Sequence, residues 1–147
     1  MAAGCATADE ISASTGAASY CGSCIQALTT LTGDPGGTPV VAEIERIGGD
    51  LLVVTLKPID GANFPQRHVS GGHVVLSIKD EKGWVSRPYT ITSPPEEVDR
   101  RVLVVRCLTS GRMGRVLARS HGNARARIGT PRGDAFARLA GVLDRAG

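Results

Sequence analysis

The middle of the chain is a succession of short strand-like segments separated by glycine and proline turns. Val40 to Ile47 and Leu51 to Leu56 flank Gly48-Gly49-Asp50, a combination typical of a hairpin. Further strand patterns occupy residues 73–78, 84–93 and 99–108. Several short strands, followed late in the chain by one helical segment over 115–121, predict a mainly β fold built as a small antiparallel barrel.

The stretch from Arg87 to Ser93 brings together side chains suited to an extended cofactor. Alternation places Arg87 and Tyr89 on one face of a strand, about 6.6 Å apart. Arginine offers a planar fork of donors to phosphate, tyrosine a flat amphipathic ring, and Thr90 a hydroxyl that can donate or accept. Pro88 has no backbone N–H, which suits a strand edge left open to a ligand. The alternative is an ordinary hairpin strand with a surface arginine and a half-buried tyrosine.

At these residues the sequence resembles the FAD-binding barrel of the ferredoxin–NADP reductase superfamily, whose signature is Arg-x-Tyr-Ser/Thr. Residues 71–78 resemble the preceding strand of that family, and Gly111-Arg112-Met113-Gly114 resembles its phosphate-binding turn. The resemblance implies FAD as cofactor, with Arg87 on phosphate, Tyr89 stacked on the isoalloxazine and Thr90 near its reactive nitrogen. The implied cofactor-binding residues are Arg87, Pro88, Tyr89, Thr90, Gly111, Arg112, Met113 and Gly114.

The late helix fits the same interpretation. It would begin after Gly114, where the family usually has a serine, and end at Gly122. Backbone N–H groups at its start would face outward unpaired, and a pyrophosphate is a natural partner for them and for the helix dipole. We therefore expect a Greek-key barrel with one phosphate-binding helix.

The segment 1–33 contains a Cys-x-x-Cys pair, Cys21 and Cys24, and two short helical patterns. Zinc, a dithiol redox pair and an iron–sulfur cluster all use this spacing. With its neighbours, the pair resembles the C-terminal half of the bacterioferritin-associated-ferredoxin-like [2Fe–2S] domain, which also occurs in nitrite reductases. The resemblance implies Cys21 and Cys24 as metal ligands. It also implies an incomplete ligand set, because the Cys-x-Cys pair of the family would lie roughly thirty residues upstream.

The sequence divides into four predicted parts. These are the partial [2Fe–2S] module at 1–33, a glycine- and proline-rich linker at 34–39, the FAD-binding barrel at 40–138, and the start of a link at 139–147. Residues 128–136 resemble the Gly-Pro-x-Gly closing segment of the family. No strand–glycine-loop–helix unit follows, so we expect NAD(P)H to be held by a missing or separate domain on which activity depends.

Charge is distributed unevenly along the chain. Residues 1–99 carry six basic and twelve acidic groups, whereas residues 100–147 carry eleven arginines and two aspartates. The basic half has a single aromatic residue, Phe136, so it lacks the stacking platforms of single-strand binders, and we expect no nucleic-acid partner. Phosphate-bearing cofactors or an acidic redox protein would use the charge, and a basic surface without a special role is the alternative.

Several further expectations complete the sequence interpretation. The chain has no apolar run of about 18 residues and no secretory signal pattern, so we expect no membrane span and a cytoplasmic location. Cys107 is expected in the core, and His68, His73 and His121 at the surface or in loops. The predicted function is an FAD-binding electron-transfer oxidoreductase component that passes electrons between NAD(P)H, flavin and a [2Fe–2S] centre in the complete enzyme. The alternative is a non-catalytic scaffold subunit or a degenerate gene fragment.

Overall fold

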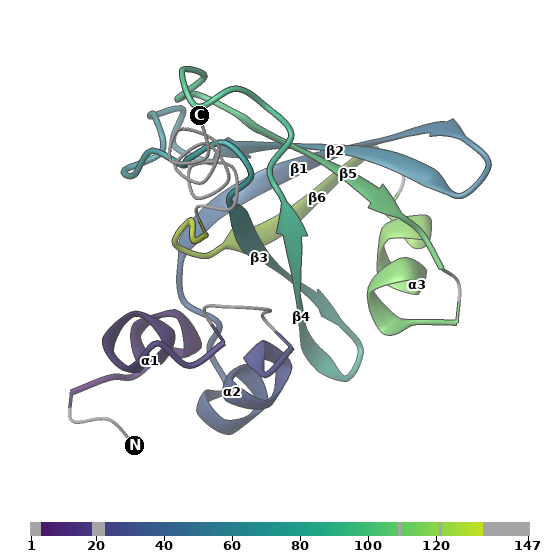
Figure 1. Cartoon of the computed structure of the whole chain (residues 1–147). Helices are drawn as coiled ribbons and strands as arrows, with labels where there is room; N and C mark the ends of the chain where they lie inside the picture. Colours follow the sequence, from purple (N-terminus) through teal and green to yellow (C-terminus); the bar gives the residue numbers. More distant parts are fainter. Residues whose placement is uncertain (1–3, 19–22, 109, 121, 134–147) are drawn as a thin grey trace, which may run out of the picture.

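The computed structural model describes residues 4–18, 23–108, 110–120 and 122–133 (Figure 1). Within these ranges the chain forms three helices and six strands. They are α1 (Ala8–Thr15), α2 (Ile25–Thr32), β1 (Thr38–Gly48), β2 (Leu51–Pro58), β3 (His73–Asp80), β4 (Gly83–Thr90), β5 (Arg101–Arg106), α3 (Arg112–Arg119) and β6 (Gly122–Ile128). None of these helices is both long and apolar enough to cross a membrane.

The six strands form one antiparallel sheet in the order β4-β3-β6-β1-β2-β5. Strands β4 and β5 lie at the two ends of that order, and the sheet curls so that they approach each other (Figure 1). Ile91 forms a bridge with Leu103, and Thr92 N–H donates to the Val102 carbonyl at 2.8 Å. The predicted mainly β barrel is therefore confirmed, as a half-barrel closed by a few contacts between its edges.

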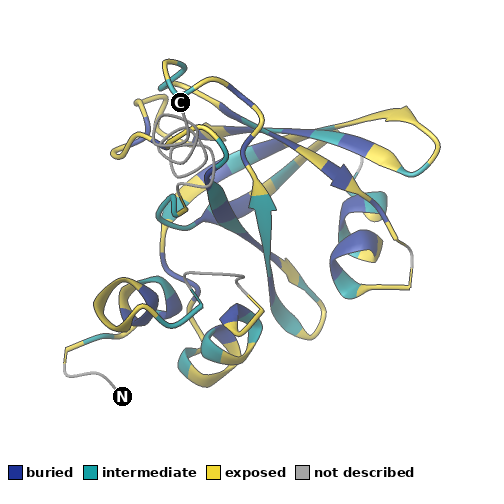
Figure 2. Ribbon diagram, in the orientation of Figure 1, coloured by how far each residue is buried: buried dark blue, intermediate teal, exposed yellow. Residues whose placement is uncertain are grey.

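Alternating residues of the strands fill the core. In β5, Leu103 and Val105 point inward while Val104 and Arg106 are exposed, as the period of two requires. Cys107 is buried at the end of the same segment, so its prediction as a core residue is confirmed. Buried residues recur along the strands and occur in all three helices (Figure 2).

The two N-terminal helices pack against the barrel. A capping box starts α1, with Glu10 N–H donating to the Thr7 hydroxyl and the Glu10 carboxylate accepting from Thr7 N–H. Asp9 then accepts from the backbone N–H and the hydroxyl of Thr130, at 3.0 and 2.8 Å, which attaches α1 to the end of β6. Helix α2 lies against β4 (Figure 1). Helices α1 and α2 are thus both attached to the barrel.

Most element predictions match the structure, and two differ. Helix α3 begins at Arg112, three residues earlier than expected, because Gly111 and not Gly114 is its N-cap, and it ends at Arg119 with Ser120 as its C-cap, so Gly122 starts β6 and does not end the helix. Strand β6 was not predicted, since its inward positions are mainly alanine. His68 lies in a loop, one of the two settings expected for it, but it is buried, and its Nε2 lies 2.9 Å from the Ser93 carbonyl oxygen.

Candidate functional site

Strand β4 presents the Arg87 to Thr90 stretch at a free sheet edge. The backbone of Ser86 points away from β3, because its N–H donates to Gln26 and its carbonyl accepts from Arg87. Alternation places the backbone of Pro88 on the same outer side, so its missing N–H breaks no bond to β3. The guanidinium of Arg87 donates through Nη1 to the Gln26 side-chain oxygen at 3.1 Å and to the Ser86 carbonyl at 2.7 Å.

Tyr89 and Thr90 have different surroundings. Tyr89 is half-buried and packs against the core, and burial raises the pKa of its phenol above the ordinary value, with Arg87 opposing the shift. Its hydroxyl therefore stays protonated at neutral pH and its ring offers a flat surface at the rim of the barrel. Thr90 is exposed at the end of β4, where its hydroxyl faces solvent. The two residues are consecutive in β4, so the ring and the hydroxyl leave the strand on opposite faces.

The start of α3 offers backbone donors. The first intrahelical bond runs from Arg115 N–H to the Gly111 carbonyl, and Gly111 has no side chain to cap the helix. The N–H groups of Arg112, Met113 and Gly114 precede that bond, and within the described residues they have no acceptor. Such groups at a helix N-terminus, with the helix dipole behind them, bind anions.

Gly114 explains how closely α3 approaches the chain before it. A Cβ at this position would overlap the carbonyl group of Leu108, so only glycine fits. The Gly114 carbonyl accepts from the Cys107 thiol at 3.1 Å. Met113 is buried in the core, so it can offer a ligand only its backbone. Helix α3 contacts both β3 and β4, which brings the predicted turn close to the Arg87 strand.

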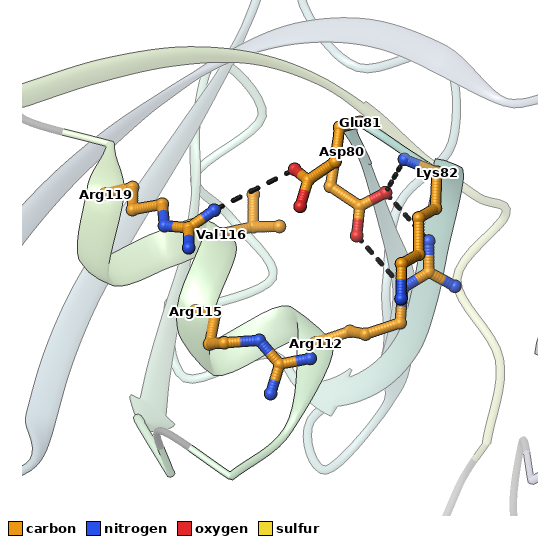
Figure 3. A pocket seen from close by; sticks show the side chains of 7 residues that line it. All are labelled: Asp80, Glu81, Lys82, Arg112, Arg115, Val116 and Arg119. Atoms are coloured by element: carbon orange, nitrogen blue, oxygen red, sulfur yellow. Dashed lines mark hydrogen bonds and ion pairs between the residues drawn. The ribbon is translucent and has the colours of Figure 1, made fainter.

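Arg112 is occupied by an ion pair. Its Nη2 and Nε donate to the two oxygens of Asp80, at 2.8 and 3.0 Å, which lowers the pKa of that carboxyl to about 2. The pair stands in a pocket of about 160 Å³ between α3 and the β3–β4 turn (Figure 3). Arg115 and Arg119 of the same helix face also line it, and Arg119 lies 3.8 Å from Glu81 (Figure 3). Arg115 donates to the Ser110 carbonyl at 3.0 Å.

The predicted metal ligands do not form a site in the described part of the chain. Cys21 lies outside the described residues. Cys24 is exposed at the N-cap of α2. Across 4–18, 23–108, 110–120 and 122–133, no cluster of three or more His, Cys, Asp or Glu side chains is placed to hold a metal ion. The [2Fe–2S] centre therefore remains a prediction from the resemblance.

The structure adds two residues that sequence reasoning missed. Gln26 contacts Arg87 from a position 61 residues away, and Asp80 contacts Arg112 across 32 residues. No motif marks either residue. Asp80 had a weak signal, because an acidic residue beside a hairpin turn that faces a basic helix is a natural ion-pair partner.

Most of the chain matches a model of a known protein family. A family model described as an oxidoreductase FAD-binding domain matches residues 40–136. This range contains β4 and α3 with all eight predicted cofactor-binding residues. The Cys-x-x-Cys segment lies outside it. A comparison with curated proteins found no match.

Solved structures share the fold at low sequence identity. One is phthalate dioxygenase reductase, which has a modular structure for electron transfer from pyridine nucleotides to [2Fe–2S]. It is 22% identical to this chain, with a TM-score of 0.57. The match covers 67% of this chain and 30% of that one. A ferredoxin NADP+ reductase from Neisseria gonorrhoeae with bound FAD and NADP is 16% identical with a TM-score of 0.54, over 66% of this chain and 38% of that one. This chain thus spans well under half the length of either structure.

Proposed function

Because the chain belongs to the oxidoreductase FAD-binding domain family, we propose that it binds FAD and serves as the flavin-carrying component of an electron-transfer oxidoreductase. One observation carries the proposal most directly. Helix α3 contacts the strand bearing Arg87 and Tyr89, and the N–H groups of Arg112, Met113 and Gly114 at its start have no acceptor among the residues that the structure describes. The start of α3 is a suitable partner for the diphosphate of FAD, and Tyr89 is a suitable partner for its isoalloxazine ring.

The residues present fit the cofactor on chemical grounds. A diphosphate needs several donors and positive charge, which the start of α3 and the guanidinium of Arg87 supply. The isoalloxazine needs a flat partner, and Tyr89 offers a half-buried ring whose phenol remains neutral. The exposed hydroxyl of Thr90 is available to a ring nitrogen.

We assign the roles as follows. Arg87 holds phosphate, the backbone from Gly111 to Gly114 cradles the diphosphate, and Tyr89 stacks on the isoalloxazine. FAD, when bound, supplies the redox chemistry, and the protein supplies binding, orientation and electrostatic tuning. The basic face of α3 adds positive potential that draws an anionic cofactor to the site.

The route of electrons beyond the flavin is a finer part of the same proposal. We propose NAD(P)H as the donor, held by a separate domain, and a [2Fe–2S] centre or an acidic redox protein as the acceptor. The modular reductase among the structural neighbours, whose description names both pyridine nucleotides and [2Fe–2S], supports this order. Cys21 and Cys24 would supply half of a four-thiolate set.

A titration tests the proposal. The purified chain is titrated with FAD and, separately, with FMN, and binding is followed by the change in flavin fluorescence. We expect FAD to bind more tightly, because only FAD carries the diphosphate that the start of α3 suits. Equal affinity for FMN, or no binding of either flavin by a chain whose circular dichroism shows it to be folded, would refute the assignment.

A further inference from the structure

Helix α2 covers part of the free edge of β4, and one side chain makes the contact specific. The amide of Gln26 faces the strand like a short piece of backbone. Its oxygen accepts from Ser86 N–H at 2.8 Å and its nitrogen donates to the Trp84 carbonyl at 3.1 Å. Two outward-facing groups of an edge strand are thereby satisfied without another strand.

The same amide oxygen also accepts from Arg87 Nη1 at 3.1 Å, and that nitrogen donates in addition to the Ser86 carbonyl. Both N–H groups of Nη1 are therefore engaged. The three N–H groups on Nε and Nη2 have no partner among the described residues. These three remain available for two oxygens of one phosphate group.

Gln26 is also a suitable partner because it is neutral. A carboxylate in its place would compensate the charge of Arg87 and compete with a phosphate for the same N–H groups. The Gln26 amide accepts one hydrogen bond from Arg87, restricts a long side chain that would otherwise sample many rotamers, and leaves the positive charge in place.

We propose that Gln26 is a positioning residue for the cofactor site, which holds Arg87 in the orientation that receives a phosphate of FAD. The inference rests on the proposed function, since it assumes that Arg87 is a phosphate ligand. It gives α2 a role that lies outside the matched family range 40–136: a helix from the N-terminal segment tunes the affinity of the barrel for its cofactor.

The test measures FAD affinity in Gln26→Ala and in a matched control, Thr29→Val. The Thr29 hydroxyl lies 2.9 Å from that of Ser86, so the control weakens the contact of α2 with β4 without touching Arg87. We expect both variants to lower the melting temperature. Only Gln26→Ala should weaken FAD binding, by up to roughly tenfold, the size of one lost hydrogen bond.

A double-mutant cycle with Arg87→Ala then decides the route of the effect. If Gln26 acts through Arg87, Gln26→Ala should change the FAD affinity of the Arg87→Ala protein by less than about twofold. Three results would overturn the inference: wild-type affinity in Gln26→Ala, an equal loss in Thr29→Val, or an undiminished loss in the Arg87→Ala background. A wild-type chain that is folded and binds no FAD would instead refute the proposed function, and this inference with it.

Discussion

Arg87 on β4 and Arg112 on α3 stand on the two elements of the candidate flavin site, yet they have different partners. Arg87 donates to two neutral oxygens, those of the Gln26 amide and the Ser86 carbonyl. Arg112 donates twice to the carboxylate of Asp80, and the pair lowers the pKa of Asp80 while raising that of Arg112. Among the described residues no carboxylate pairs with Arg87, so its charge is uncompensated there, whereas Asp80 balances the charge of Arg112.

The difference indicates a division of labour. Uncompensated charge attracts phosphate, so Arg87 is suited to contact the cofactor directly. A paired arginine is suited to hold α3 against the β3–β4 turn, where it fixes the direction of the helix. At α3 the groups left for a phosphate are the backbone N–H groups, and their placement depends on how closely the helix approaches Leu108.

The largest effect should follow from filling that close approach. Replacing Gly114 with serine places a Cβ against the Leu108 carbonyl, and backbone atoms cannot rotate away as a side chain does. We expect Gly114→Ser to destabilise the fold by about 3 kcal/mol, measured by urea denaturation, and to weaken FAD binding. The matched control is Gly111→Ala, because a Cβ there would be 3.8 Å from the Leu108 oxygen, an ordinary contact. Similar losses in both variants would argue against the steric explanation.

Arg87→Ala should have the next largest effect, on affinity. Removing the uncompensated guanidinium should weaken FAD binding by ~1.5–3 kcal/mol, the range for a hydrogen bond to a charged group. Arg87→Lys keeps the charge and loses the planar fork, so it should recover only part of the affinity. An unchanged dissociation constant in Arg87→Ala would mean that the phosphate binds to another part of the molecule.

Arg112→Ala tests directly whether the two arginines contribute differently to FAD binding. Because the charge of Arg112 is balanced by Asp80, its loss should weaken FAD binding by less than ~1 kcal/mol, below the range expected for Arg87→Ala. Calorimetric titration of Arg87→Ala and Arg112→Ala side by side measures the ratio. If Arg112→Ala weakened binding as much as Arg87→Ala, the division of labour between the two arginines would be wrong.

Sequence patterns predicted the parts of the fold that have strong local signals. Segments rich in Val, Ile and Leu became β1, β2, β3 and β5, and the Gly-Gly-Asp turn between β1 and β2 is where it was expected. Strand β6 was not predicted, because Ala124 and Ala126 at its inward positions have little strand preference. Its position in the sheet is determined by pairing with β1 and β3, which are distant in the sequence, so a local pattern does not reveal it.

In the candidate site too, local motifs predicted some residues, whereas others are recognised only from long-range contacts. The resemblance identified the eight residues of β4 and the α3 turn, and their role in binding FAD remains to be measured. The partners of the two arginines were not foreseen. Gln26 lies in a helix with no motif, and its contact with Arg87 exists only because α2 packs on the edge of β4. Asp80 belongs to no motif, and its contact with Arg112 exists only because the fold places α3 beside the β3–β4 turn (Figure 3).

The smallest effect concerns the pH dependence of the Asp80–Arg112 pair. The pKa of Asp80 falls from an ordinary 3.8 to about 2 in the folded chain, mainly because Arg112 donates to it. A carboxyl whose pKa is lower in the folded state adds stability above its unfolded value and loses that contribution as the pH falls through its folded value. Glu10, Asp50 and Glu97 also have lowered pKa values, so acid weakens the wild type at several places at once.

Asp80→Asn isolates the contribution of this pair. The variant should be less stable than the wild type near neutral pH, and the difference should shrink between about pH 4 and about pH 2. High salt should also reduce the difference, because the pair stands at a solvent-accessible pocket. Urea midpoints for both proteins across this range provide the measurement. A stability difference that stayed constant down to about pH 2 would mean that Asp80 acts through its shape and hydrogen bonds alone. Arg112 would then carry a charge as free as that of Arg87.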